Sequence, residues 1–362
     1  MERELTRGPV MKTMLVFAVP MILGDLLQQC YNIADTVIVG QFLGTDALAA
    51  VGSSFSLMTF LTSILLGMCM GSGAVFSIRF GEGDLPRLKN SLSLSFLMIA
   101  AFTVVMNLAV FLLIDPMMGL LQVPEEVYPL MRSYLWVIFW GIGGTFLYNY
   151  FACLLRAIGN SATPLLFLGI SAVLNIALDL VFVVVVPWGV AGAAFATSLS
   201  QWVSGLGLLA FTLVKMPQLR PSRQDVRWEK DRVLEIARFS LLTCVQQSVM
   251  NFGILMVQGL VNSFGTVVMA AFAAAVKIDS FAYMPVQDFG NAFSTFIAQN
   301  YGARDMGRIR RGIRSAVLAA AVFSGAVSVL VCVFAEPLLL LFVKPEEREI
   351  LAVGVQYLRV EG

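Results

Sequence analysis

Carboxylates and amides interrupt stretches of this chain that are otherwise apolar enough to cross a bilayer. The first stretch carries four polar residues, spaced three, four and three positions apart: Asp25, Gln28, Asn32 and Asp35. This spacing predicts a polar stripe along one face of a helix. A later stretch carries Asn175 and Asp179, four residues apart, and another carries Thr197 beside Ser198. A charged group at the centre of a bilayer costs at least about 2.5–3.5 kcal/mol, so each carboxylate is a candidate functional residue.

Two carboxylates, an amide and a hydroxyl from three helices can bind a cation. Na⁺ is held by oxygen ligands, and a desolvated aspartate can carry a proton instead. The same groups would also serve as hydrogen bonds between helices, and the residues alone leave both interpretations open. Pro20 removes a backbone hydrogen bond within the first helix, which predicts a kink that is either static or responsive to protonation of Asp35.

The composition identifies the class of protein. Of the 362 residues, 58% are hydrophobic and 13% are charged, against roughly 25% charged residues in a soluble domain. The chain has no histidine, which excludes histidine metal sites and Ser-His-Asp triads. Its five cysteines stand singly in apolar stretches, without metal or disulfide spacing. We therefore expect a membrane protein that is not an enzyme and has no cofactor.

Nine apolar segments approach the ~20 residues needed to cross the hydrocarbon. They lie at 13–40, 50–77, 91–114, 131–153, 162–186, 190–214, 235–262, 268–298 and 313–342, and a tenth begins near Leu351. Lys and Arg concentrate in alternate connections, with 19 on one side of the predicted topology and three on the other. The positive-inside rule then predicts a multi-pass protein of the inner (plasma) membrane with a cytoplasmic N-terminus. Topology accounts for the basic residues, so no nucleic acid partner is expected.

The chain contains an internal repeat. A shift of 221 positions places residues 44–126 on 265–347 and aligns Gly81 with Gly302 and Asp84 with Asp305. Duplication of a hydrophobic chain is typical of transporters. Because the basic connections of both copies fall on the same side, we predict two parallel six-helix repeats: a first lobe at 1–217, a linker at 218–234 and a second lobe at 235–362. The second repeat ends after about three and a half helices, which indicates a fragment or a natural truncation.

Short motifs along the whole chain form a specific combined pattern. They are Pro20, Tyr31-Asn32-Ile33-Ala34-Asp35-Thr36, Val39-Gly40, Gly44, Arg156-Ala157-Ile158-Gly159-Asn160, Pro164, Asn175, Asp179 and Gln299-Asn300-Tyr301-Gly302-Ala303. This pattern resembles the multidrug and toxic compound extrusion (MATE) family, in its bacterial DNA-damage-inducible branch. The resemblance implies V-shaped lobes around a cavity and export of cationic or amphipathic compounds in exchange for Na⁺ or H⁺. It also implies that an acidic pocket binds the coupling cation, at Asp35, Asn175, Asp179 and Thr197.

Further polar residues are candidates for lining the cavity: Asp25, Gln28, Asn32, Gln246, Gln247, Asn251, Lys277 and Asp288. Lys277 and Asp288 are eleven residues apart and so lie on nearly the same helical face. They either line the cavity or pair within the second lobe. The seventh helix offers no acid beyond Glu235 at its start, so we do not expect the second-lobe coupling found in some relatives.

Other functions are also compatible with parts of the pattern. A flippase for lipid-linked oligosaccharides would share this architecture, and a non-transporting truncated fragment remains an alternative. An intramembrane aspartyl protease is disfavoured, because neither Asp35 nor Asp179 lies in a Tyr-Asp or Gly-x-Gly-Asp motif. For the antiporter, the expected partners are the lipid bilayer and a small organic substrate, and the full-length protein is expected to be monomeric.

Overall fold

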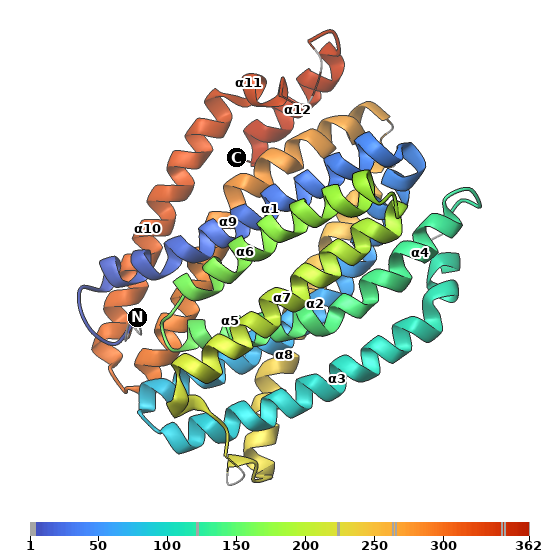
Figure 1. Ribbon diagram of the computed structural model, residues 1–362. Helices are drawn as coiled ribbons and strands as arrows, with labels where there is room; N and C mark the ends of the chain where they lie inside the picture. The colour runs from blue at the N-terminus through green and yellow to red at the C-terminus, as the bar shows by residue number, and fades with distance from the viewer. Residues whose placement is uncertain are drawn as a thin grey trace.

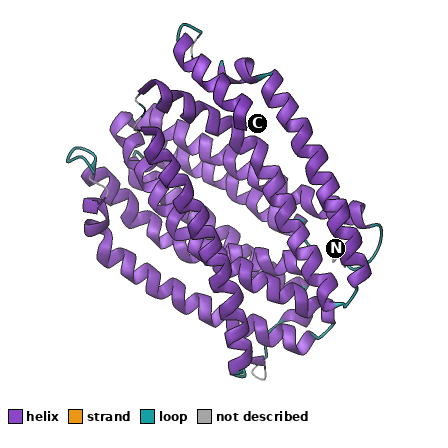
Figure 2. Cartoon of the chain, turned by 180° about the vertical axis from the view of Figure 1, so that it is seen from behind, coloured by secondary structure: helices purple, strands orange, loops and turns teal. Residues whose placement is uncertain are grey.

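The computed structural model describes residues 5–361, except 121–122, 223–224, 263, 265, 342 and 344. This part of the chain is a bundle of long helices without strands (Figures 1 and 2). The helices are α1 (Val10–Leu43), α2 (Thr45–Glu82), α3 (Leu85–Leu120), α4 (Tyr128–Ile138), α5 (Ile142–Ala157), α6 (Ala162–Asp179), α7 (Gly189–Lys215), α8 (Lys230–Asn262), α9 (Thr266–Gly302), α10 (Met306–Val333), α11 (Ala335–Leu339) and α12 (Arg348–Glu361). The all-α membrane fold predicted from the sequence is confirmed.

Most predicted spans lie within helices that extend beyond them. Eight helical runs of the described chain are long and apolar enough to cross a membrane, and α8 adds a more polar ninth. The fourth predicted span is two helices, α4 and α5, joined by the 3-10 turn η1 (Phe139–Gly141). The ninth span, predicted at 313–342, is wrong at its end: α10 stops at Val333 and α11 follows. Pro337 lacks the N–H that would bond the carbonyl of Val333. Residues 230–234 of the predicted linker are helical.

Helices α1–α7 form what we call the first lobe, and α8–α12 form the second lobe. One end of the bundle, here called the basic end, gathers residues 5–9, 83–84, 158–161, 216–222, 225–229 and 303–305. Hydrogen bonds tie these segments together. The backbone N–H of Leu5 donates to Oε1 of Gln299 at 3.0 Å, and Nε2 of Gln299 donates to the carbonyl of Ala157 at 2.6 Å. The lobes are therefore in contact at this end.

Equivalent glycines of the two repeats meet at the basic end. A Cβ atom added to Gly81 would overlap the backbone of Gln299, and one added to Gly302 would overlap the backbone of Ile78. The shift of 221 positions relates Gly81 to Gly302 and Ile78 to Gln299. These are thus one contact, seen from each lobe. Because α2 and α9 both end there, the parallel arrangement of the two repeats is confirmed.

Each lobe also holds the segment that leads into the other lobe. Nδ2 of Asn90, on α3, donates to the carbonyls of Asp225 and Arg227 in the linker, both at 2.9 Å. On α10, Arg308 is 6% exposed and holds the N-terminal segment. Its guanidinium donates to three carbonyls at 2.6–3.2 Å: those of Leu5, Arg7 and Gly8. The N-terminal segment therefore crosses from the first lobe to the second.

We expect Arg308→Ala to free the N-terminal segment. A hydrogen bond from a charged donor contributes about 1.5–3 kcal/mol, and this guanidinium makes four such bonds. Trypsin should then cleave after Arg7 at least about tenfold faster, because about 1.4 kcal/mol changes an opening equilibrium tenfold. Arg311→Ala, at an exposed position on the same helix, is the matched control. Equal cleavage rates for both variants would contradict this role of Arg308.

The strongest packing between the lobes joins α2 to α8. A Cβ atom at Gly71 would lie 2.5 Å from Cα of Ser240, and one at Gly67 would lie 2.8 Å from Cα of Cys244. The hydroxyls of Ser72 and Ser240 are 3.3 Å apart within this interface. Small residues allow close approach of helices in a bilayer, where burial of apolar surface does not favour one helix contact over lipid. The contact between α2 and α8 is thus held by backbone packing and hydrogen bonds.

Candidate cation-coupling site

The structure brings together the four residues predicted to bind the coupling cation. Asp35 lies on α1, Asn175 and Asp179 lie on α6, and Thr197 lies on α7. Nδ2 of Asn175 donates to Oγ1 of Thr197 at 3.2 Å. The carboxyl groups of Asp35 and Asp179 lie within electrostatic reach of each other across the contact between α1 and α6. Their role in coupling stays a prediction, but their proximity is now a structural fact.

Burial leaves several oxygen atoms of this cluster without protein partners. Asp179 is 0% exposed and Asn175 is 2% exposed. Within the described chain, buried oxygens without a hydrogen bond include Oδ1 of Asp35, Oδ1 of Asn175 and both carboxylate oxygens of Asp179. An unsatisfied buried acceptor costs about 1–3 kcal/mol, and two adjacent carboxylates resist ionising together. A proton or a hard cation with oxygen ligands would relieve both costs, so the residues fit either ion.

A change of helix type fixes the position of Asp179. It is the last residue of α6, and the next six residues form the π turn η2 (Leu180–Val185). Gly189 closes this segment with φ +63°, and the carbonyl of Phe182 accepts from the backbone N–H of Trp188 at 2.8 Å. Single π turns occur frequently at functional sites. The predicted spans at 162–186 and 190–214 placed a break at Pro187-Trp188-Gly189, but the π turn that precedes this break was not predicted.

Close packing against α5 fixes the position of α7. A Cβ atom at Gly205 would lie 2.6 Å from the carbonyl oxygen of Gly144. The indole N–H of Trp202 donates to the carbonyl of Trp140 at 2.8 Å. Because the backbones touch, α7 cannot slide along α5 without breaking these contacts. Thr197 is thereby presented to Asn175 from a fixed helix.

Two tyrosines complete the surroundings of the carboxyl pair. Tyr134 of α4 is 7% exposed and lies within electrostatic reach of Asp35 and Asp179. Tyr31 of α1 lies within reach of Asp35. Neither was predicted as a site residue, because a tyrosine within an apolar stretch has the same sequence signature whether it packs in the core or borders a site. A core tyrosine and a site tyrosine can be told apart only once the structure shows that α1, α4 and α6 meet.

The predicted kink and cavity residues on α1 lie on a continuous helix. Helix α1 runs from Val10 to Leu43 with Pro20 inside it. Gln28 is exposed and interacts with Tyr31, and Asn32 is half-buried, with its carbonyl accepting from the hydroxyl of Thr36 at 2.8 Å. A role in lining a substrate cavity stays a prediction for both.

The candidate cavity residues of the second lobe differ in burial and in the contacts that they make. Nε2 of Gln247 lies 3.7 Å from Sδ of Met70 and so joins α8 to α2, whereas Gln246 is exposed and Asn251 is half-buried. On α9, Lys277 is exposed and Asp288 is buried. Lys277 and Asp288, both within the described part of the chain, form no ion pair within 4.0 Å. Asp288 instead interacts with Asp25 of α1.

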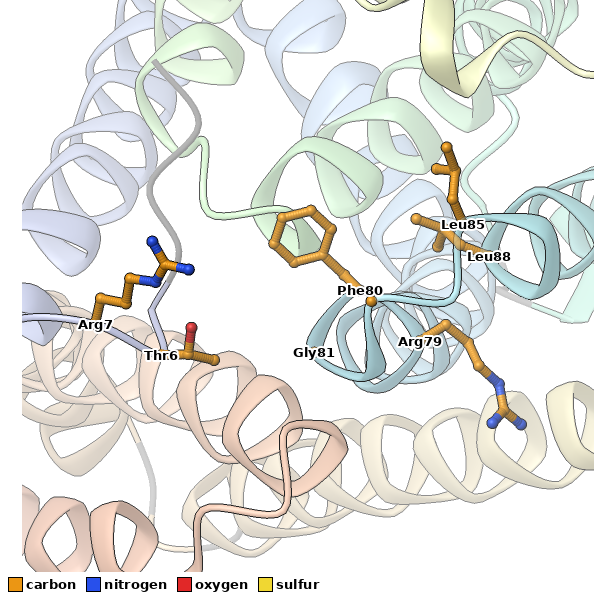
Figure 3. Close-up of a pocket in the computed structure, with 8 residues that line it drawn as sticks. Thr6, Arg7, Arg79, Phe80, Gly81, Leu85 and Leu88 are labelled. Atoms are coloured by element: carbon orange, nitrogen blue, oxygen red, sulfur yellow. The ribbon is translucent and has the colours of Figure 1, made fainter.

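A cavity of about 360 Å³ lies at the basic end, between the N-terminal segment and the turn from α2 to α3 (Figure 3). Its lining consists of Thr6, Arg7, Arg79, Phe80, Gly81, Gly83, Leu85 and Leu88. None of these residues belongs to the carboxyl cluster. Arg79 is paired with Glu82 at 3.0 Å and with Glu235 at 2.5 Å, so its charge is already compensated. The cavity is therefore separate from the candidate coupling site.

The family model described as MatE matches residues 20–181 and 242–361 of this chain. The chain belongs to the MatE family. Probable multidrug resistance protein YpnP of Bacillus subtilis is 29% identical to this MatE chain, over 98% of the chain and 79% of YpnP. A protein of Shewanella oneidensis named FAD transporter is 25% identical, over 93% of the chain and 75% of that protein.

A solved structure of a MOP superfamily transporter from Pyrococcus furiosus has the same fold. It matches with a TM-score of 0.90 and 24% sequence identity, over 98% of this chain and 79% of the other. The arrangement of α1–α12 is thus the MatE arrangement, and the chain is a membrane transporter of this family.

Proposed function

We propose that this MatE protein is a secondary active antiporter that exports cationic or amphipathic organic compounds in exchange for Na⁺ or H⁺. The observation that carries the proposal is the cluster of buried, unpaired oxygens of Asp35, Asn175 and Asp179. A bound monovalent cation offsets one of the two negative charges of this cluster, and its loss leaves adjacent carboxylates whose repulsion favours another arrangement of helices. Ion binding thus shifts the population of transporter states, as coupling requires.

The position of Pro20 suggests how the first helix responds. It lies on α1 between the basic end and Asp35, and it leaves one backbone carbonyl of α1 without its helical donor. Movement of Asp35 relative to Asp179 would bend α1 most easily at this point. We further propose that the basic end faces the cytoplasm of a plasma-membrane protein, because the positive-inside rule places Lys and Arg there. The protein would act as a monomer within the bilayer.

The charges of the two carboxyl pairs favour an organic cation as substrate. Asp25, Asp35, Asp179 and Asp288 are carboxylates on α1, α6 and α9, and the cation that opposes them among the described residues is Arg156, which interacts with Asp25 and Asp288. A flippase for lipid-linked oligosaccharides would need a cationic cavity to hold its phosphates. The related protein named FAD transporter nevertheless makes a flavin nucleotide a necessary competitor in any substrate assay.

Transport driven by a single imposed gradient tests the proposal. Proteoliposomes holding the full chain would be given either a Na⁺ gradient or a pH gradient, with ethidium as the transported cation. One gradient should drive ethidium against its concentration, and excess flavin nucleotide should not compete. If neither gradient drives ethidium while a lipid-linked oligosaccharide crosses the bilayer, the flippase interpretation replaces the antiporter.

Thr197→Val is expected to weaken binding of the coupling ion roughly fivefold to tenfold. Valine keeps the shape of threonine but removes the hydroxyl that accepts from Asn175, and one net hydrogen bond contributes about 1 kcal/mol. The ion concentration giving half-maximal ethidium transport measures this effect. Ser198→Ala is the matched control, because that hydroxyl donates to Val137 outside the carboxyl cluster. An unchanged half-maximal concentration in Thr197→Val would exclude Thr197 from the site.

A further inference from the structure

Buried apolar side chains line the contact between α1 and α9, starting at the basic end and running toward the middle of the bundle. We call this row of side chains the seam. From α1 it contains Met14, Phe17, Ala18 and Met21, and from α9 it contains Ala292 and Phe296. On α1 the next residue on the same helical face is Asp25, four positions beyond Met21. On α9 the next is Asp288, four positions before Ala292. Because the two helices run in opposite directions, their faces bring these two aspartates to the same level of the seam.

Asp25 and Asp288 meet where this seam ends. Helices α1 and α9 are in contact, and Asp25 and Asn291 both lie within electrostatic reach of the carboxyl group of Asp288. Asp288 is 4% exposed, and its Oδ2 is buried without a hydrogen-bond partner. The pair therefore links the first lobe to the second through two acids, one of which carries an unsatisfied oxygen.

One positive charge lies near this pair. Arg156 of α5 interacts electrostatically with both Asp25 and Asp288, and its Nε is buried without a hydrogen-bond partner. It makes no ion pair within 4.0 Å among the described residues. The other titratable groups that interact with these residues are Tyr148 and Cys153 of α5, and Tyr31 of α1 reaches Tyr148. None of these three carries a charge at neutral pH in its ordinary state.

Charge balance decides what this group of residues can hold. With both carboxylates ionised and one guanidinium present, the seam carries a net negative charge beside apolar side chains, which is unfavourable. With one proton shared between the carboxylates, the net charge of the three groups is zero and the unpaired oxygen gains a donor. A metal cation suits the pair less well, because the guanidinium repels it and Asn291 is the sole additional polar ligand among the contacts of Asp288.

We propose that Asp25 and Asp288 form a second proton-binding site, on the contact between the lobes, where one shared proton holds the α1–α9 seam closed. Loss of this proton leaves two carboxylates facing each other, and their repulsion separates α1 from α9 along the seam that leads to the basic end. The site is distinct from the cluster at Asp35 and Asp179, since no described interaction joins the two carboxyl pairs. It would allow the lobe contact itself to respond to protons.

Distance measurements between the lobes test this proposal without measuring transport. Leu85 and Met306 begin α3 and α10, are equivalent in the repeat and are 39% and 51% exposed. A spin-labelled non-natural residue at each position would leave the five native cysteines in place. In the wild-type chain the separation at the basic end should be short at low pH and should lengthen as the pH is raised and the pair loses its shared proton. Asp46→Asn, at an exposed carboxylate, should behave like the wild type.

Asp288→Asn should keep the short separation over the whole pH range, because the amide donates to Asp25 as the shared proton does. Asp25→Asn carries the same expectation and replaces the first variant if that protein is not monodisperse. Arg156→Gln should move the transition to higher pH, because losing the positive charge favours the protonated pair. A wild type that does not respond to pH, or an Asp288→Asn variant with the wild-type transition, would overturn the proposal. A tenfold loss of tetraphenylphosphonium affinity in Asp288→Asn with the transition intact would instead assign the pair to organic cations.

Because transport is not measured, failure of the antiporter proposal and failure of this inference are separate outcomes.

Discussion

Asp179→Asn is expected to abolish ion-driven export while leaving the protein folded. The carboxyl group of Asp179 is 0% exposed, faces Asp35 and has two oxygens without partners. The amide removes one of the two negative charges that would hold the ion, and a hydrogen bond or contact to a charged group contributes about 1.5–3 kcal/mol, so the gradient-driven rate should fall roughly 10-fold to 100-fold. Asp35→Asn should have the same effect, because either amide breaks the pair. Ethidium transport in proteoliposomes under the effective gradient measures both.

Stability separates a lost coupling site from a misfolded protein. Asparagine replaces a buried ionisable group by a neutral one of equal size, so the melting temperature of Asp179→Asn should equal or exceed that of the wild type. Asp46→Asn, on the exposed start of α2, is the matched control and should transport normally. Full gradient-driven transport by both Asp35→Asn and Asp179→Asn would show that coupling does not use this cluster.

Gly302→Ala should have the second-largest effect, on stability and on closure of the basic end. A Cβ atom at this position would overlap the backbone of Ile78, at the contact where the two repeats meet. Overpacking of this kind costs typically about 1–3 kcal/mol. We expect a lower melting temperature in detergent and a slower export rate, because the lobes can no longer approach closely. Gly81→Ala should behave alike, since it makes the equivalent contact with Gln299.

Gly290 provides the control on the same helix. It has no heavy atom within 4 Å of an added Cβ, so Gly290→Ala should change stability by no more than about the 1 kcal/mol that separates glycine from alanine in a helix, in the stabilising direction. The difference in melting temperature between Gly302→Ala and Gly290→Ala separates the effect of the contact with Ile78 from the effect of helix propensity. Equal stability of Gly302→Ala and Gly290→Ala would mean that the lobes do not meet as closely as the structure indicates.

The sequence predicted most membrane spans and the parallel orientation of the two repeats, because both depend on local patterns. Apolar length located the spans, and the basic connections showed that the repeats are parallel. The aligned Asp84 and Asp305 turned out to be equivalent caps, each accepting from the backbone N–H three residues later, at 3.0 and 2.8 Å. Such caps are local hydrogen bonds. The grouping of Asp35, Asn175, Asp179 and Thr197 rested on the family resemblance, and the structure places these residues together.

Contacts between distant faces were not predictable in the same way. Periodicity shows that Asp25 lies on one face of α1 and Asp288 on one face of α9, but not that these faces meet. In a bilayer, helix pairing follows small residues and backbone contact more than apolar pattern. The repeat aligned Gly81 with Gly302 without indicating that the two glycines occupy the same contact. The π turn after Asp179 also depends on packing of Gly192 against Phe182, which no local spacing encodes.

The two carboxyl pairs occupy different places in the fold. Asp35 and Asp179 lie within the first lobe, whereas Asp25 and Asp288 lie across the contact between lobes. Under the proposed function, the first pair binds the ion that is exchanged and the second responds when the lobes separate. Each pair can therefore be altered without directly changing the other.

Release of the coupling ion on addition of substrate tests the central claim of exchange most directly. Purified full chain, loaded with the effective ion in weak buffer, would receive tetraphenylphosphonium while a proton- or Na⁺-sensitive probe records the solution. We expect the wild type to release the ion and Asp179→Asn to release none. Equal release by the wild type and by Asp179→Asn would contradict exchange at this site.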